Sequence, residues 1–339
     1  MSSIDIVIPC YRYGQYLRDC VQSVLTQGVD KVRVLIIDDE SPDETPEVGA
    51  ALAREDARVT YRRHVVNLGH ISTYNEGIKW ASADYMLLLS ADDYLLPGAL
   101  KRAMELMDAR PDVGLCFGEA VALNEGGKTT PMKVDVDAGG KPSIVLTGAD
   151  FVRLCVRGGS NNVVPTPTAV VKTNLLKLVG GYRADLPHSG DFELWLRLAA
   201  HASVGVVKAN QAVYRRHSGN MSLAYFQDNC LTDLQQRKAA FDVFLHSCRE
   251  VLPGAERLQR SLLKALAREA VGHASSAFNG NRLDLSHRLC EFAASLHPGV
   301  RRSAAWNALT FKRLIGWKMS SALLPAVVRI RAATARIRI

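Results

Sequence analysis

The sequence predicts an α/β fold with a mixed, mostly parallel sheet flanked by helices and followed by a C-terminal helical region. Short, continuously apolar segments alternate with stretches of helical periodicity over residues 4–118, which is typical of parallel strands covered on both faces. Two of these segments run directly into paired aspartates, as strands do where a parallel sheet ends at a ligand site. The chain has 339 residues, 47% of them hydrophobic, which is enough for one large domain or two smaller ones.

Five strands and four helices are expected in residues 4–118. Each expected strand is a short run rich in β-branched residues or leucine, which favour a buried, pleated backbone. The expected helices place apolar residues three or four positions apart, on one face. The strands are expected at residues 4–8, 32–37, 59–61, 85–89 and 113–117, and the helices at 15–26, from 42 onward, at 71–81 and at 98–107.

The rest of the chain carries weaker patterns. We expect an irregular segment at residues 119–147 with a hairpin around Asn124–Gly127, because asparagine and paired glycines favour turns. Residues 148–220 mix helical and strand patterns. Residues 223–296 have the pattern of helices, with breaks at Pro253–Gly254 and Asn279–Gly280.

The cysteines and the N-terminal residues predict a cytoplasmic protein. The seven cysteines are odd in number and show no C-x-x-C spacing, which argues against a disulfide framework and against a zinc cluster. No apolar run approaches the roughly 20 residues that span a bilayer. The first residues lack the basic and apolar segments of a secretion signal.

Positive charge is concentrated at the C-terminal end. The formal net charge is +8, but no acidic residue follows Glu291, so residues 1–291 hold 33 positive against 34 negative charges. Aromatic residues accompany the basic ones, so residues 299–339 are expected either to lie on an anionic membrane surface or to be a solvated basic end. Nucleic acid is not an expected partner, because no nucleic-acid module is recognisable. The nine basic residues are Arg301, Arg302, Lys312, Arg313, Lys318, Arg329, Arg331, Arg336 and Arg338.

Two aspartate pairs indicate a binding site at the end of the sheet. Asp38–Asp39 follows the strand expected at 32–37, and Asp92–Asp93 follows the strand expected at 85–89. Either pair alone would be explained as a helix cap or a turn. Mg²⁺ and Mn²⁺ typically bind one or two protein carboxylates together with phosphate oxygens. Two pairs on separate strands therefore predict a site for a nucleotide diphosphate and a divalent cation.

Ordered sequence blocks over residues 4–222 resemble family 2 glycosyltransferases of the GT-A fold. The blocks come in the family's order, and it is the ordered set that is specific. They are Val7–Tyr11, Ile36–Asp43, Asn67–Gly69, Asn75–Gly77, Leu89–Asp93, Gly180–Tyr182, Asp191–Arg197 and Tyr214–His217.

The resemblance implies roles for particular residues. Asp191 would be the catalytic base of an inverting transfer, with Glu193 as the next candidate. Asp92 would coordinate Mn²⁺ or Mg²⁺ beside Asp93, and His217 would contact the metal or the diphosphate. Asp39 would face the base of a nucleotide-diphospho-sugar, for which a UDP-sugar is expected. The whole nucleotide-binding set would be Pro9, Tyr11, Asp38, Asp39, Asn67, Gly69, Asn75 and Asp92.

The resemblance also implies an organisation and a pathway class. A GT-A domain would span residues 1–222, with a nucleotide-binding half (1–118) and an acceptor and catalytic half (119–222). A helical region (223–298) and a basic tail (299–339) would follow. The acceptor would be a saccharide or a lipid-linked molecule in the assembly of cell-surface polysaccharide or glycolipid. The protein would be cytoplasmic and could lie on the inner face of the membrane.

Three departures from the family pattern keep alternatives open. Ser90 replaces the first aspartate of a D-x-D block, Gly190 replaces the first acid of an E-D pair, and Thr73–Tyr74 stand where Ala-Arg is commoner. A non-catalytic nucleotide-sugar-binding or scaffold protein of the same fold is one alternative, and a nucleotidyltransferase is another. His217 could also be a surface histidine, and Asp191 could be a helix N-cap.

Overall fold

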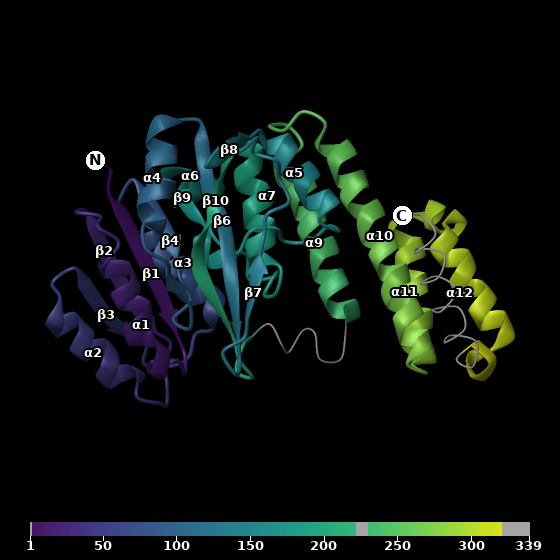
Figure 1. The fold of residues 1–339 in the computed structure, drawn as a ribbon, viewed down its shortest axis with the longest axis horizontal. Helices are drawn as coiled ribbons and strands as arrows, with labels where there is room; N and C mark the ends of the chain where they lie inside the picture. The colour runs from purple at the N-terminus through teal and green to yellow at the C-terminus, as the bar shows by residue number, and fades with distance from the viewer. Residues whose placement is uncertain (1, 222–229, 321–339) are drawn as a thin grey trace.

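The computed structural model describes residues 2–221 and 230–320, and they form one ten-stranded mixed sheet with helices packed against it (Figure 1). The strand order is β3-β2-β1-β4-β9-β6-β10-β5, with β7 paired to β6 and β8 paired to β10. Strands β1 to β4 run parallel, as do β6 and β10, whereas β9 runs antiparallel between β4 and β6. The fold class predicted from the sequence is confirmed.

The elements alternate along the first half of the chain as the apolar pattern predicts. The strands are β1 (Ile4–Cys10), β2 (Val32–Asp38), β3 (Val59–Arg63), β4 (Tyr85–Leu88), β5 (Tyr94–Leu95), β6 (Val113–Asn124), β7 (Thr129–Met132), β8 (Ser143–Leu146), β9 (Val170–Lys172) and β10 (Ser203–Arg216). The helices that pack on them are α1 (Gly14–Leu25), α2 (Thr45–Glu55), α3 (His70–Trp80), α4 (Ala99–Ala109), α5 (Gly148–Arg157), α6 (Thr173–Val179) and α7 (Gly190–His201).

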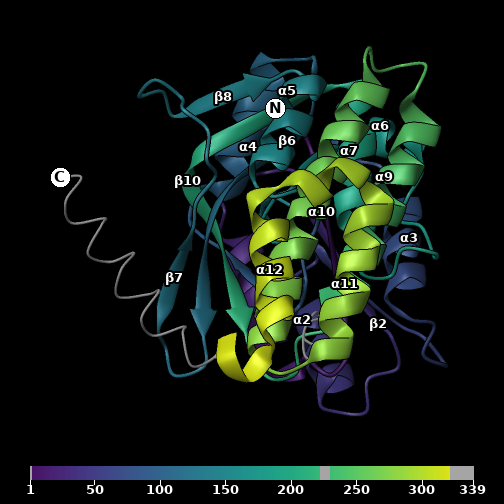
Figure 2. The ribbon, with the colours of Figure 1, turned by 90° about the vertical axis from the view of Figure 1, so that its right-hand side faces the viewer.

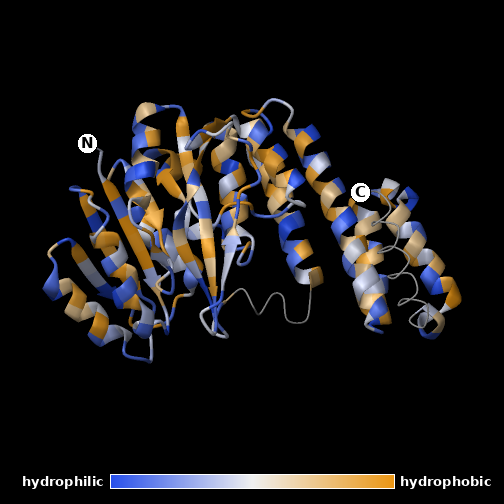
Figure 3. Ribbon diagram, viewed as in Figure 1, coloured by the Kyte–Doolittle hydropathy of each residue, from blue (hydrophilic) through white to orange (hydrophobic). Residues whose placement is uncertain are grey.

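The central strands are apolar on both faces because each face supports a separate core. Alternate side chains of a strand point to opposite faces. Ile4, Ile6 and Ile8 of β1 pack with helices α1 and α4, whereas Val7 packs in the core that contains residues of α3, α5 and α7. In Figure 3 these strands are mostly apolar, and the helices around them mix apolar and polar residues.

Further helices in residues 230–320 extend the core that contains Val7 away from the sheet. They are α9 (Cys230–Cys248), α10 (Ala255–Asn279), α11 (Leu283–Leu296) and α12 (Ala304–Ile315). Figure 2 shows α10, α11 and α12 side by side. Lys312 Nζ donates to Asn279 Oδ1 at 3.0 Å, which ties α12 to the end of α10. None of the described helices combines the length and apolar character needed to cross a bilayer.

Two element boundaries differ from expectation. The helix expected from Pro42 begins at Thr45, because Ser41 and Asp43 form the preceding turn: Ser41 N donates to Asp38, and Thr45 N to Asp43. Residues 119–147 are not irregular throughout, since β6 continues to Asn124 in register with β10. The hairpin at Asn124–Gly127 is confirmed.

The expected basic tail is only partly described. Its first part is the packed helix α12, and Trp306 and Trp317 contact the core around α10. The four arginines beyond residue 320 lie outside the described residues, as do residues 223–229 of the expected helical region.

Candidate active site

Parallel pairing brings the carboxyl ends of three strands to one edge of the sheet. Cys10 of β1 pairs with Asp38 of β2, and Val7 pairs with Leu88 of β4. The segments that follow these strands therefore lie next to one another, as the strand-end argument predicted. Two neighbouring cavities open along this edge, and Tyr13, Tyr74 and Ser90 line both of them.

Asp92 and His217 form the junction between the two cavities. Asp92 Oδ2 lies 3.2 Å from His217 Nε2 and accepts a hydrogen bond from Asn220 Nδ2 at 3.1 Å. Asp93 Oδ1 accepts from Arg215 N at 2.9 Å, and Arg215 also donates to the backbone oxygen of Asp92. The last residues of β10 and the segment after it thus hold both aspartates in place.

The electrostatics of this junction favour a cation. Burial raises the pKa of Asp92, although the neighbouring His217 offsets part of the effect. Burial and the adjacent charge of Asp92 raise the pKa of Asp93 well above its usual range. Both shifts have the sign expected of buried carboxylates, whose charge a bound cation would offset. Among the described residues, no three histidine, cysteine or acidic side chains converge on one point. One imidazole and one carboxylate, completed by phosphate oxygens, would suit Mn²⁺ or Mg²⁺, which commonly take only one or two protein carboxylates.

Asp39 holds the loop that forms one wall of the larger cavity. Its carboxylate accepts hydrogen bonds from the backbone N–H groups of Leu68 and Gly69, both at 2.8 Å, and contacts His64 Nδ1 at 2.7 Å. Asn67 Nδ2 donates to the backbone oxygen of Asp39 at 2.8 Å. This cavity has a volume of about 690 Å³, within the range of small-ligand sites.

His64 links the loop to helix α3. Its second ring nitrogen lies 2.8 Å from Glu76 Oε2, so carboxylates contact both nitrogens. Burial alone would lower the pKa of His64, but the hydrogen bonds to Asp39 and Glu76 outweigh it and raise the pKa. A doubly protonated ring, with both nitrogens donating, fits these contacts.

The expected nucleotide-binding residues divide into two groups. Five of them line the larger cavity, and Asp92 lines the smaller one. Asp38 and Asn75 line neither, and both have structural contacts instead. Asp38 is fully buried and accepts from Ser41 N and Tyr61 OH, whereas Asn75 forms paired hydrogen bonds with the backbone of Tyr182. The five residues in the larger cavity are Pro9, Tyr11, Asp39, Asn67 and Gly69.

Asp191 lies in the first turn of helix α7 and faces the smaller cavity. Its Oδ2 accepts from Thr166 Oγ1 at 2.9 Å and from Asn162 Nδ2 at 3.0 Å, and its Oδ1 accepts from Phe192 N at 2.7 Å. The N-cap position belongs to Ser189, so Asp191 is not the cap. Burial raises the pKa of Asp191, and the hydrogen bond from Thr166 offsets part of the shift.

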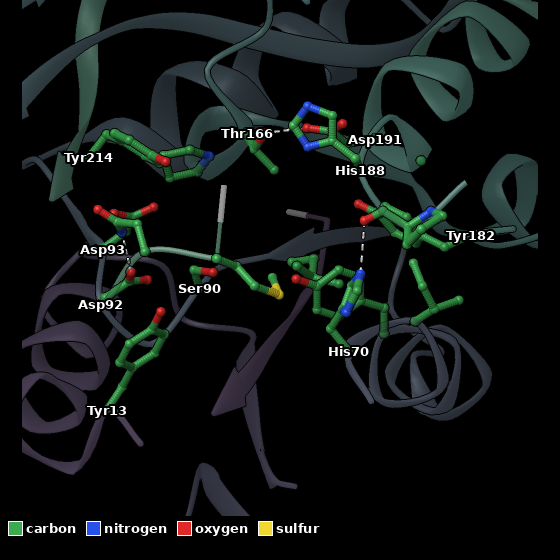
Figure 4. A pocket seen from close by; sticks show the side chains of 18 residues that line it. Tyr13, His70, Ser90, Asp92, Asp93, Thr166, Tyr182, His188, Asp191 and Tyr214 are labelled. Carbon is green, nitrogen blue, oxygen red and sulfur yellow. Dashed lines mark hydrogen bonds between the residues drawn. The ribbon is translucent and has the colours of Figure 1, made fainter. Parts of the chain in front are cut away.

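Figure 4 shows Asp92 and Asp93 on one side of the smaller cavity and Asp191, with Thr166 and His188, across from them. The space between holds about 190 Å³. The structure therefore brings Asp92 and Asp93 to the same cavity as Asp191, which lies about one hundred positions later in the sequence.

Several lining residues were not expected from the sequence. Four tyrosines line the smaller cavity, and Tyr74 and Tyr182 contact each other edge-to-face with ring centroids 5.0 Å apart. Aromatic rings and polar tips suit a sugar, which has both apolar faces and hydroxyl groups. Tyr182 and Tyr214 belong to two of the sequence blocks that resemble the family, but the resemblance assigned them no role in the site. Tyr74 is a departure from the family pattern, and no motif marks Tyr13. The other unexpected residues are Tyr13, His70, Thr166, Tyr182, His188, Tyr214 and Asn220.

The departures at residues 90 and 190 also lie in the cavity wall. Ser90 lines both cavities, and Gly190 lines the smaller one. A Cβ atom at Gly190 would contact only Tyr182 and Ile71, at 3.4 and 3.9 Å, so a side chain would fit there. Glu193 is fully buried and pairs with Arg197 at 2.8 Å, and it lines neither cavity. Glu193 is therefore not a suitable alternative base.

Comparison with known proteins agrees with this geometry. The family profile of Glycosyl transferase family 2 matches residues 5–148. An uncharacterized glycosyltransferase of Escherichia coli, YibD, is 27% identical over 234 residues, which cover 66% of this chain and 67% of that protein.

Two solved structures share the fold at low sequence identity. Staphylococcus aureus TarS 1-349, in complex with UDP-GlcNAc, superposes with a TM-score of 0.66 and 14% identity, covering 96% of this chain and 92% of that one. The mannosyltransferase PcManGT from Pyrobaculum calidifontis, in complex with GDP-Man and Mn²⁺, gives a TM-score of 0.50 and 15% identity, covering 95% and 86%. Over residues 5–148, the chain is therefore similar to glycosyl transferase family 2.

Proposed function

We propose that the protein is an inverting, metal-dependent glycosyltransferase that moves a sugar from a nucleotide-diphospho-sugar to an acceptor hydroxyl. One observation carries the proposal: Asp191 lies across a single cavity from Asp92, which His217 contacts at the junction with the larger cavity. A base and a diphosphate site on opposite walls are what an in-line displacement at a sugar carbon requires.

The side chains of this site supply the proton transfer and the orientation. Asp191 accepts the proton of the acceptor hydroxyl while that oxygen attacks the anomeric carbon. The bond from that carbon to the diphosphate breaks on the opposite face, so the configuration inverts. Thr166 and Asn162 donate to one oxygen of Asp191 and fix its direction toward the cavity.

Asp92 and His217 would hold a divalent cation, with Asp93 beside them. When bound, Mn²⁺ or Mg²⁺ neutralises the charge that develops on a leaving diphosphate. The support from this chain is the pair of buried carboxylates at the junction and the imidazole next to them. PcManGT, which shares the fold, was solved with Mn²⁺.

The larger cavity would hold the nucleotide, with Asp39 facing its nucleobase. The relatives of known structure were solved with UDP-GlcNAc and with GDP-Man, so the fold accepts more than one base. We propose a UDP-sugar donor and a saccharide or lipid-linked acceptor, in the assembly of cell-surface polysaccharide or glycolipid. The basic C-terminal residues would place the enzyme on the inner face of a membrane.

Donor hydrolysis tests the proposal without knowledge of the acceptor. The full-length protein would be incubated with UDP-, GDP- and dTDP-sugars, with and without Mn²⁺, and release of the nucleoside diphosphate would be measured. Metal-dependent release from one nucleotide series is expected. Binding without release would favour the non-catalytic alternative. Release of pyrophosphate from a nucleoside triphosphate and a sugar phosphate would favour a nucleotidyltransferase.

A further inference from the structure

A buried charged cluster connects helices α9 and α10 to the wall of the smaller cavity. At its centre is Arg237 of α9, which is 3% exposed. Its guanidinium donates twice to Asp233, at 2.7 and 3.0 Å, and twice to Glu269 of α10, at 2.7 and 2.8 Å. A fifth contact, at 3.2 Å, goes to the backbone oxygen of Ser160. These contacts use all five N–H groups of an arginine, so its position is fully determined.

One branch of the cluster leads to His188. Asp233 Oδ1 lies 2.8 Å from His188 Nε2. Burial would raise the pKa of Asp233, but His188 and Arg237 together lower it. Asp233 is therefore an ionised acceptor, and Nε2 of His188 must donate. His188 lines the smaller cavity and lies beside Asp191 in Figure 4.

The other branch leads to Asp191 through the loop between α5 and β9. Ser160 is fully buried, and its hydroxyl donates to the backbone oxygen of Leu262 on α10 at 2.7 Å. Its φ of 62° lies in the left-handed region, so the surroundings must hold the loop in this shape. Two residues further on, Asn162 donates to Asp191 at 3.0 Å.

We propose that Arg237 and Asp233 are positioning residues that set two side chains of the reaction cavity together: His188 through Asp233, and Asp191 through the loop at Ser160–Asn162. The proposal rests on the proposed function of Asp191 as the base. On this proposal, helices α9 and α10 contribute to the geometry of the active site, although they follow the family match at residues 5–148. A base displaced by about 1 Å can lose up to about 10²-fold in rate, so such bracing affects turnover.

Two substitutions test the branches, and α9 provides a matched control. Asp233→Asn keeps the size of the side chain and removes the charge that His188 and Arg237 share. Ser160→Ala removes the hydrogen bond to Leu262 and leaves the contact with Arg237. Asp242→Asn is the control, because Asp242 also pairs with a cation four residues away on α9, Lys238, but at the exposed surface.

Nuclear magnetic resonance of the full chain can observe both branches without an activity measurement. An imidazole N–H held by a buried carboxylate exchanges slowly with water and gives a downfield proton signal, which His188→Gln would assign. We expect Asp233→Asn to lose this signal and Asp242→Asn to keep it. We expect Ser160→Ala to shift the side-chain amide signals of Asn162. Should Asp233→Asn fail to fold, Ser160→Ala still tests the bracing.

Donor hydrolysis then links the bracing to turnover. In Asp233→Asn, kcat should fall by about tenfold or more at an unchanged donor KM, and in Asp242→Asn it should stay within about twofold. Unchanged His188 and Asn162 signals in the two variants would overturn the proposal. Equal losses of kcat in Asp233→Asn and Asp242→Asn would overturn it as well. Absence of hydrolysis by the unmodified protein would count against the proposed function, and the spectroscopic result would still decide the bracing.

Discussion

Replacing Asp191 by asparagine should remove catalysis while leaving the fold and donor binding intact. A general base typically contributes about 10²–10⁴-fold, so turnover should fall by that factor. Asp191 lines the smaller cavity and not the larger one that would hold the nucleotide, so the Kd for UDP should stay within about twofold of the parent value.

The effect of Asp191→Asn on stability follows from the contacts of the carboxylate. An asparagine oxygen can still accept from Thr166 and Asn162, so only the hydrogen bond from Phe192 N is lost, which costs about 1 kcal/mol. The pKa of Asp191 is raised by burial, so the ionised form is less favourable in the folded than in the unfolded protein. Removing that charge offsets the loss, and Tm should change by no more than about 4 °C.

The raised pKa of Asp191 also sets the pH dependence of the reaction. The base must be ionised, so the rate of hydrolysis should fall on acidification at a higher pH than for an ordinary aspartate. Nucleotide release across a pH series measures this, with calorimetry of UDP binding and thermal melts as controls for Asp191→Asn. Turnover within about tenfold of the parent would refute the assignment of the base. A large drop in Tm would refute the account of its contacts.

Three further predictions concern the metal, the core and the C-terminal residues. In calorimetry, Mn²⁺ should increase the affinity for UDP, and His217→Ala should reduce that increase by about tenfold or more. Equal UDP affinity with and without metal would contradict the cation site. Glu193→Gln should lower the free energy of unfolding by about 3–5 kcal/mol in urea melts, because it leaves the charge of the buried Arg197 without its partner. The control is Lys238→Gln, which breaks an exposed pair and should lower the free energy of unfolding by less than about 1 kcal/mol. Equal losses in the two variants would refute this account. Truncation after Ser320 removes four arginines, each of which contributes about 1 kcal/mol to binding near an anionic surface. Co-sedimentation with anionic liposomes at low salt should therefore decrease. Full-length protein that stays in the supernatant would rule out the membrane role.

The central strands, and the position of the two aspartate pairs at the edge of the sheet, could be predicted from the sequence because these signals are local. A run such as Ile4–Ile8 has one stable environment, a buried strand, and acids that follow it must lie at the sheet edge. The extension of β6 to Asn124 was not predictable in this way, because that half of the strand depends on pairing with β10, about ninety residues later.

Neighbouring residues in one motif lie in different surroundings. Asp38 is the last residue of β2, and its side chain points into the protein, whereas Asp39 begins the loop and reaches the cavity. Only the end of the strand and the pleat separate the two, and a pattern of two adjacent acids does not show where the strand ends. Asn75 likewise matches a family block, yet its partner, Tyr182, lies 107 positions away.

The cysteines of this chain offer a practical route to observing helix α9. Six of the seven thiols are buried, and Cys230, the first residue of α9, is the one with intermediate exposure. A maleimide dye should therefore react at Cys230 well before the others, without any engineered cysteine. Because Cys230 lies one helical turn before Asp233, the dye would report on the helix that braces the cavity. Its fluorescence could follow, in real time, whether α9 shifts when a nucleotide-sugar is added.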